Sequence, residues 1–538
     1  MKYLSNILAV MATGLLLFVA TSCADFGDLN VNPTQSTDMD PGFQMSYCQV
    51  WMSQNRYEAW RTNFILTSCM IQHTAHTGSY FEGDKYTYNI PSYNAALWES
   101  AYTREIKNII DLINRIEGDP LYTNTYHAAR ILKVYIFSRL TDLHGDIPYS
   151  EAGLGFLERE FFPAYDTQES IYLDFLSELE SSVAGLNASE ASVRGDIFFN
   201  GDVAKWKKWG NSLRLRLGFR LAKVNPSLAQ ETVAAAIAGG VMESNADMVV
   251  MQHDAIRTNG NSDVFYADKG MRLAKTFVDH MIETGDPRLP IYGAIFMDQT
   301  TLDNYPIPNA TSTPINNEVG SFNMVVDATT GQNILFNAYA DRTGIDGMPN
   351  GTEAADLGDG EINRFVQPNY ANIAPRATPY IHQSYAEVEF LLAEAAVRGW
   401  GGATDAAGHF ANALRAMVEM MAIYPGESAS IVESADIDAY VAANPLTGGT
   451  EEQLEQIGTF LWSALYLDGY EAFASWRRTG YPNLVPVDHP SGITGGTIPR
   501  RIHYPIAEAA NNAENYAAAV ARMTDGDSYT SRVWWDAQ

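Results

Sequence analysis

Helical periodicity is the sequence feature that most restricts the fold of this chain. One series of apolar residues advances in steps of four and three positions: Tyr102, Ile106, Ile109, Ile113 and Ile116. That spacing places the whole series on one face of a helix. Residues 125–143 are apolar on nearly every side, which predicts a helix buried among others. The pattern therefore predicts a mostly α protein.

Further helices are expected on both sides of a loop-rich part. Asp166, with Glu169 three positions later, indicates a helix start, and Asp202 can cap the next helix. Helices are predicted again at residues 384–399, 404–423 and 451–479. Pro, Asn, Gly, Thr and Asp accumulate between residues 300 and 380, where helical periodicity fades. No strict tetratricopeptide repeat is found, but paired helices are expected. The helical scaffold is expected at about 41–230 and 384–480.

The charged residues within these helices can be interpreted in two ways. The helix after Asp202 carries seven Lys and Arg residues between positions 205 and 223, which could attract an anionic ligand. Arginines that lie between helices and pair with carboxylates are the favoured interpretation. A catalytic carboxylate pair could be sought among Glu387, Glu389 and Glu394. Their spacing on one helix does not by itself place two carboxylates about a scissile bond. Partners for arginines are favoured there too.

The N-terminus has the order of a secretory signal. Lys2 precedes a weakly polar to apolar run at 7–20, and Thr21-Ser22 lead to Cys23. The run is shorter than the roughly 20 residues that span a membrane. A cysteine after small residues resembles the lipobox of bacterial lipoproteins, although Ala20 stands where leucine is usual. Residues 1–22 are therefore predicted to be a signal peptide, Cys23 the lipid attachment site and 23–40 an acylated tether.

Charge and cysteine content exclude some classes of partner. Removal of residues 1–22 takes away only Lys2 among the charged residues, so 64 Asp and Glu face 34 Lys and Arg. Such an acidic chain does not suit nucleic acid, which selects basic surfaces. Only Cys48 and Cys69 then remain besides Cys23. If residues 43–72 form one helix, these two lie about 31 Å apart, so we expect two buried free thiols.

Seven segments, in order, resemble the SusD-like (SusD/RagB) outer-membrane lipoproteins, most closely the second branch of that family. Gly-Asp-Ile-Pro-Tyr at 145–149 and Gly-Asp-x₃-Trp-x₄-Asn-Ser-Leu-x₂-Arg at 201–216 are two of them. The full set lies at residues 142–152, 201–217, 285–290, 385–395, 477–482, 498–505 and 533–536. Each is weak alone, but seven in order behind a lipoprotein signal are specific.

This resemblance implies a tetratricopeptide-like helical scaffold with long loops, in a body covering residues 41–538. It also implies a cell-surface lipoprotein of the Bacteroidetes outer membrane. The family partners a SusC-like TonB-dependent transporter, to which it passes a captured nutrient. A glycan or oligosaccharide is the favoured ligand, a peptide ligand is the alternative within the family, and no catalytic residue or cofactor is implied.

The best candidate for ligand binding is the segment 78–93. It carries Tyr80, Phe81, Tyr86 and Tyr88 between glycines and a proline. Flat rings in a loop suit stacking on sugar faces and equally suit peptide side chains. The same rings could instead pack the loop onto the scaffold.

Metal and enzyme signatures are weak. The acidic loop at 341–361 is rich in oxygen ligands that suit calcium, but Thr343 and Ile345 stand where an EF-hand needs Asp or Asn. A solvated acidic loop is favoured, and no metal site is predicted. The motifs of zinc peptidases, serine hydrolases and P-loop proteins are absent. A surface glycoside hydrolase stays open as the alternative, because its two carboxylates need no local motif.

Overall fold

The computed structural model describes residue 3 and residues 39–425 and 434–537. Cys23 and the predicted signal segment, apart from residue 3, lie outside the described residues, as does most of the predicted tether. No helix among the described residues has the length and apolar character needed to cross a membrane.

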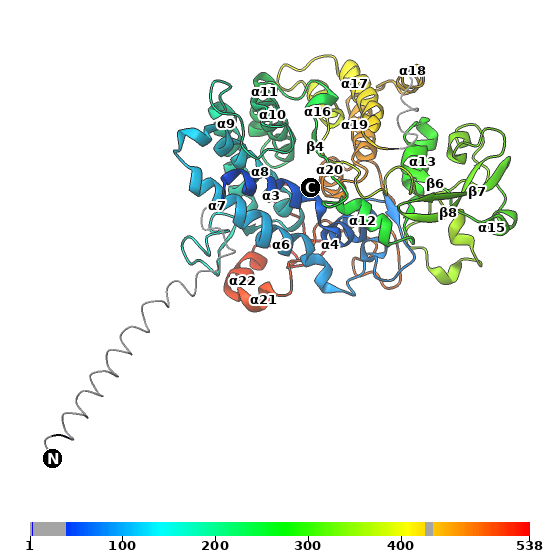
Figure 1. Cartoon of the computed structure of the whole chain (residues 1–538), viewed down its shortest axis with the longest axis horizontal. Coiled ribbons are helices and arrows are strands. Elements are labelled where there is room, and N and C mark those ends of the chain that lie inside the picture. The colour runs from blue at the N-terminus through cyan, green and yellow to red at the C-terminus, as the bar shows by residue number, and fades with distance from the viewer. Residues whose placement is uncertain (1–2, 4–38, 426–433, 538) are drawn as a thin grey trace.

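The N-terminal part is a succession of helices that occupies the left and centre of Figure 1. The main ones are α3 (Pro41–Gln54), α4 (Arg56–Glu58), π-helical η1 (Ala59–Ser68), α5 (Glu82–Lys85), α6 (Ala96–Ser100), π-helical η3 (Ala101–Ile106), α7 (Lys107–Ile116), α8 (Thr123–His144), α9 (Gln168–Gly185), α10 (Val203–Arg220) and α11 (Pro226–Gly239). Helix α8 is buried along nearly its whole length, as its apolar sequence predicts. It packs on α9, α9 packs on α10, and α10 packs on α11.

Shorter elements follow in the middle of the chain. The helices are α12 (Gly260–Ala267), α13 (Lys275–Thr284), α14 (Leu289–Tyr292) and α15 (Gln299–Asn304). Along the described residues there are also five antiparallel strand pairs, two of which involve strands of the N-terminal part: β1 (Thr74–Ala75) with β5 (Arg272–Leu273), β2 (Ile147–Pro148) with β3 (Tyr165–Asp166), β4 (Val249–Met251) with β10 (Tyr380–Gln383), β6 (Gly293–Ala294) with β9 (Gln367–Pro368), and β7 (Ala310–Asn317) with β8 (Gly320–Asp327).

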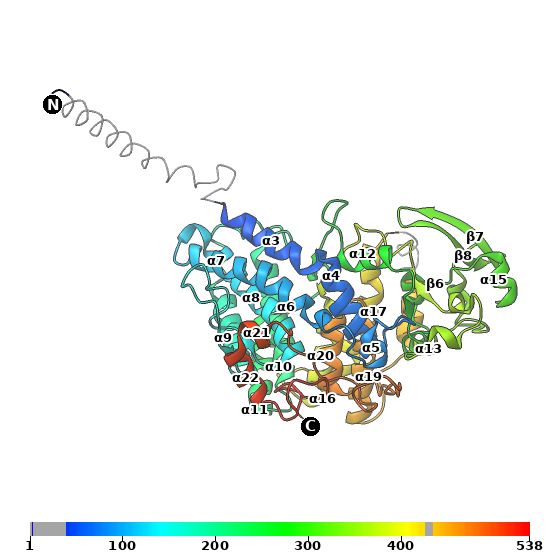
Figure 2. The same ribbon diagram turned by 90° about the horizontal axis from the view of Figure 1, so that it is seen from below.

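The C-terminal part returns to helices: α16 (Tyr385–Arg398), α17 (Ala406–Glu419), α18 (Ser434–Ala443), α19 (Thr450–Ala464), α20 (Gly469–Thr479), α21 (Glu508–Asn511) and α22 (Ala513–Ala521). Helix α16 packs on α17 and α19, whereas α20 packs on η1 and α8 near the start of the chain. The last helices, α21 and α22, lie near α6 in Figures 1 and 2, and α22 packs on β3. The two ends of the sequence thus share one body, and the prediction of a mostly α fold with helical hairpins is confirmed.

Three predicted helix boundaries are wrong in detail. The stretch 451–479 forms two helices, because Leu467 adopts a left-handed conformation (φ 80°) between α19 and α20. The stretch 43–72 is interrupted at Asn55, whose side chain accepts from the Tyr57 and Glu58 N–H groups and starts α4. Helix α9 is capped by Thr167, since the Asp166 carboxylate is already bonded to the N–H groups of residues 149 and 150.

Two other expectations have different outcomes. Cys48 and Cys69 are buried free cysteines, as predicted. The loop-rich interpretation of 300–380 missed the β7–β8 hairpin, in which Asn317 pairs with Gly320. The hairpin forms the right-hand end of the molecule in Figures 1 and 2. Met324, Val325 and Val326 of β8 are buried, so this strand is fixed by the apolar surface it covers.

Candidate functional site

The four predicted aromatic residues occupy different environments. Phe81 and Tyr86 are fully buried. The Phe81 ring stacks on His76 at 3.9 Å between centroids, and the Tyr86 hydroxyl accepts from the Val487 N–H. These two rings have no face open to a ligand, so the binding prediction can apply only to Tyr80 and Tyr88. Both of these are partly exposed.

Tyr80 and Tyr88 contact different neighbours. Tyr88 stacks on His503 with ring centroids 4.5 Å apart, in the C-terminal segment. Tyr80 instead meets Trp60 edge to face at 5.9 Å. Its hydroxyl donates to the Asp268 carboxylate at 3.2 Å. Of the predicted residues, Tyr80 is the one that lines an open cleft.

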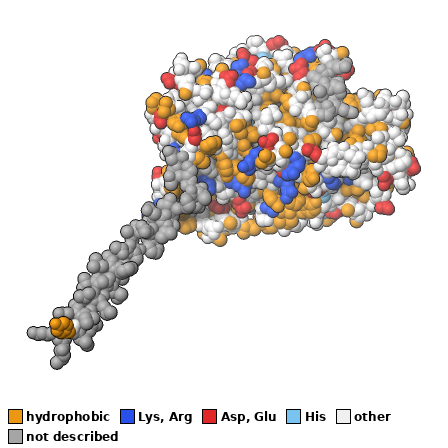
Figure 3. Space-filling view, in the orientation of Figure 1, with side chains coloured by type: hydrophobic (Ala, Val, Ile, Leu, Met, Phe, Trp, Pro, Cys, Tyr) orange, Lys and Arg blue, Asp and Glu red, His pale blue; other side chains and the backbone are white. Residues whose placement is uncertain are grey.

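This cleft lies between α4 and α12 and has a volume of about 300 Å³. We call it the Trp60 cleft. Its lining residues are Arg56, Trp60, Tyr80, Val264, Ala267, Asp268 and Lys269. Arg56 of α4 and Trp60 of η1 lie on one side of this continuous helical segment, because they are four positions apart. The polar pair Asp268-Lys269 directly follows the end of α12. Apolar and basic side chains are interspersed on the face above α4 and α12 in Figure 3.

Burial and neighbouring groups set the charge states of the polar residues in the Trp60 cleft. Burial opposes ionisation of Asp268, but hydrogen bonds from His76, Gly270 and Tyr80 outweigh burial and lower its pKa. Burial lowers the pKa of Lys269 to about 8, while burial and the neighbouring carboxylate raise the pKa of Tyr80. At neutral pH the cleft thus presents the Asp268 carboxylate and the uncharged Tyr80 phenol beside the Trp60 ring.

A second cleft of about 420 Å³ lies on the other side of α4, against α6 and η3. We call it the Arg61 cleft. Arg61 lies over the rings of Tyr57 and Tyr93, 5.4 and 5.0 Å from their centroids, and Tyr93 is in turn 6.2 Å from Trp60. The Trp60 indole N–H and the Arg61 Nε are buried and have no acceptor among the described residues. The segment formed by α4 and the start of η1 therefore separates two clefts, with the partly exposed Trp60 ring lining one and Arg61 lining the other.

The acidic loop 341–361 joins the segment 78–93 through a buried carboxylate. Asp84 accepts from Asn350 Nδ2 at 2.8 Å and from the Gly351 N–H at 2.9 Å. The loop carboxylates Asp346 and Glu353 face Arg342 and His489 respectively. Within the described residues no group of three His, Cys, Asp or Glu side chains could hold a metal ion.

Asp84 should make stability depend on pH. Burial raises its pKa to about 7, despite the hydrogen bonds from Gly351 and Asn350, whereas the unfolded carboxyl titrates near 4. The folded state therefore binds more protons between these values, and stability falls as pH rises. We expect wild type to lose about 1.4 kcal/mol per pH unit relative to Asp84→Asn between pH 5 and 7, measured by urea unfolding. For the exposed control Asp341→Asn, the dependence of unfolding free energy on pH should be parallel to that of wild type. If the dependence for Asp84→Asn were also parallel to wild type, the prediction would be contradicted.

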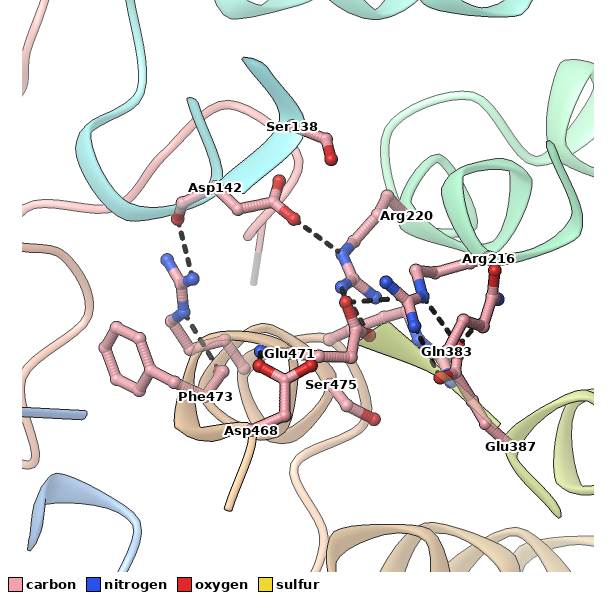
Figure 4. Close-up of polar contacts among 12 residues, drawn as sticks. Ser138, Asp142, Arg216, Arg220, Gln383, Glu387, Asp468, Glu471, Phe473 and Ser475 are labelled. Atoms are coloured by element: carbon pink, nitrogen blue, oxygen red, sulfur yellow. Dashed lines mark hydrogen bonds and ion pairs between the residues drawn. The ribbon is translucent and has the colours of Figure 1, made fainter. Parts of the chain in front are cut away.

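A group of buried charges forms a separate cluster, which we call the central cluster (Figure 4). Glu471 of α20 accepts from Arg220 with both oxygens, at 2.6 and 2.7 Å, and lies 3.6 Å from Arg216. Arg216 also donates twice to Glu387 of α16, and Arg220 approaches Asp142 of α8. All five side chains are buried. The cluster joins four helices and has no surface through which a polymer could reach it.

These contacts decide the earlier question about the charged helices. The arginines of α10 pair with carboxylates, as predicted. Glu394 accepts a bidentate bond from Arg478 at 2.7 Å, while Glu389 is bonded to His409 and Tyr385 instead. None of the three glutamates of α16 is exposed, so they do not form an accessible carboxylate pair.

Sequence reasoning missed Trp60, Asp268 and Lys269. Trp60 follows Arg56 by one helical turn in a stretch without a strong apolar stripe, and that isolated tryptophan among polar residues was the available signal. Asp268 and Lys269 have only a local signal, a charged pair after Phe265-Tyr-Ala. They lie near Trp60 only in the folded chain, because roughly 200 positions separate them from it in the sequence.

Comparison with known proteins places this geometry in a family. The model of the SusD-like family described as "Starch-binding associating with outer membrane" matches residues 33–505. A solved chitin-binding protein is 35% identical, with a TM-score of 0.78, over 93% of this chain and 100% of its own. A Bacteroidetes AC2a SusD-like structure is 27% identical (TM-score 0.79, 93% and 100% covered).

A chitin-binding SusD homologue from Flavobacterium johnsoniae is 25% identical to this chain. Its TM-score is 0.68, with 92% of this chain and 98% of the homologue covered. None of the curated proteins matches the chain. The match to most of the sequence, the helical architecture and these solved relatives agree with the seven ordered segments: the chain belongs to the SusD-like family of binding proteins associated with the outer membrane.

Proposed function

We propose that this chain is a cell-surface lipoprotein, anchored through Cys23, that captures a glycan and passes it to a SusC-like TonB-dependent transporter. Binding without turnover is the proposed activity. The observation that carries the proposal is the Trp60 cleft, where two aromatic rings stand beside fixed polar groups. Stacking rings with a few oriented donors and acceptors are the usual composition of a small-ligand site.

Among glycans, we favour chains of N-acetylglucosamine. Two solved relatives are described as chitin-binding, one of them 35% identical to this chain. The chemistry of the Trp60 cleft is compatible, because the partly exposed Trp60 and Tyr80 rings that line it can stack on sugar faces. Asp268 can accept from a sugar hydroxyl. The presence of a cleft on each side of α4 indicates an oligosaccharide rather than a single sugar.

The chain-length dependence of binding tests this function. Residues 24–538 would be titrated calorimetrically with N-acetylglucosamine oligomers from disaccharide to octasaccharide. Affinity should rise about tenfold or more with length until both clefts are occupied, and should then level off. Cellulose and starch oligomers of equal length serve as controls for the acetamido group, and a peptide panel tests the alternative ligand class.

Product analysis in the same samples tests the absence of turnover. We expect every oligomer to be recovered at its original length. Shorter products would contradict the binding role and favour a hydrolase, whereas saturable binding of peptides alone would replace the glycan by a peptide ligand.

A further inference from the structure

The segment 151–163 exposes an unusual amount of aromatic surface. Phe156, Phe161 and Phe162 are 91%, 68% and 63% exposed. Among the described residues only one other phenylalanine, Phe43, is exposed, and the rest are buried or partly buried. Single exposed apolar residues are ordinary, but a group of large ones marks an interaction surface. We call the segment 151–163 the phenylalanine loop.

Backbone hydrogen bonds hold the phenylalanine loop in one conformation. Glu151 accepts from the Ala164 N–H and Glu160 accepts from the Phe162 N–H, both at 2.7 Å. From outside the loop, Asn515 donates to the Phe162 carbonyl and Asn512 to the Pro163 carbonyl, both at 2.8 Å. The backbone beside Phe161 and Phe162 is thus preorganised, which reduces the entropy lost when a partner binds.

The loop lies at the end of the molecule where the described chain begins. Arg115 of α7 donates to the Met39 carbonyl at 2.7 Å, and Gly153 of the loop packs against Ile110 of the same helix. The two contacts are five residues apart on α7, which corresponds to about 8 Å along the helix axis, on different faces of the helix. Met39 follows the predicted lipid site by 16 positions, which limits its distance from the membrane to about 55 Å.

The character of the loop favours a protein over a lipid surface. Glu151, Glu158 and Glu160 outnumber Arg159 in this segment, and carboxylates do not suit an anionic membrane face. A group of exposed aromatic side chains is instead typical of the anchors that fill pockets at the centre of a protein interface.

We propose that Phe156, Phe161 and Phe162 are the anchors by which this chain docks into apolar pockets on the extracellular rim of its membrane-embedded transporter. The identity of the partner rests on the proposed function, but the surface is argued from the loop itself. This surface is distinct from the Trp60 cleft, so docking and ligand binding can be separated by substitution.

The test uses the full acylated chain, affinity-tagged and co-expressed with its TonB-dependent barrel, purified from detergent-solubilised outer membranes. The variant Phe156→Ser/Phe161→Ser/Phe162→Ser should retain at least tenfold less of that barrel, quantified by mass spectrometry. Its urea midpoint and its affinity for oligosaccharides should stay at the wild-type values. The matched control Ile256→Ser/Val485→Ser removes two apolar residues that are 84% and 76% exposed elsewhere, and should retain the barrel fully.

Equal retention by wild type and triple variant would overturn the docking surface while leaving the transporter partnership intact. If wild type itself retained no barrel, both the partnership and the docking surface would fail. Binding of wild type and triple variant to vesicles of phosphatidylethanolamine would be measured as well. If the triple variant lost vesicle binding but still retained the barrel, the loop would be assigned to a lipid surface instead.

Discussion

Replacement of Glu471 by Gln is expected to lower the free energy of unfolding by about 3–5 kcal/mol, because it removes one charge from a buried ionic cluster. Glu471 is the carboxylate shared by Arg216 and Arg220. Burial opposes its ionisation, but the two guanidinium groups outweigh burial and lower its pKa. Without this carboxylate, two buried arginines keep only Glu387 and Asp142 between them.

Urea unfolding at neutral pH would measure the effect, with Glu180→Gln as the matched control. Glu180 pairs with Arg214 of the same helix α10 at 3.4 Å but is 66% exposed. Solvent screening limits such a surface pair to less than about 1 kcal/mol. Comparable losses in the two variants would show that burial does not set the strength of these pairs, and the account of the central cluster would then be wrong.

The central cluster shows how far a single sequence could predict this structure. The seven Lys and Arg residues after Asp202 and the three glutamates at 387–394 were each visible as local patterns. Pairing between them was expected from the cost of burying an isolated charge. Which arginine meets which carboxylate was not predictable, because Arg220 and Glu471 are 251 positions apart and only the packing of α10 on α16 and α20 brings them together.

The candidate site was predictable to a smaller extent for the same reason. Local aromatic density identified the segment 78–93 but could not distinguish Tyr80 from Phe81, since adjacent residues share the same composition. Their environments differ because the short helix α5 begins directly after Phe81 and packs on η1. The side chains of Trp60 and Asp268 come from other parts of the chain, and no periodicity connects them to Tyr80.

Trp60 is the residue whose loss should most reduce glycan binding. It lies between two further rings, since Tyr80 and Tyr93 are 5.9 and 6.2 Å from it. Trp60→Ala removes the largest aromatic surface that lines the Trp60 cleft, so we expect at least a tenfold loss of affinity for the longest N-acetylglucosamine oligomer. Calorimetric titration would measure it.

Conservative variants test the contribution of ring size and of the neighbouring hydroxyl. Trp60→Phe keeps a smaller aromatic face and should give an intermediate loss of affinity. Tyr80→Phe removes only the hydroxyl bound to Asp268 and should reduce affinity less than Tyr80→Ala. Trp400→Ala removes a partly exposed indole that stacks on Phe219 outside both clefts and should bind as wild type. Equal affinity in wild type and Trp60→Ala would exclude the Trp60 cleft, because a ring that stacks on the ligand cannot be removed without weakening the complex.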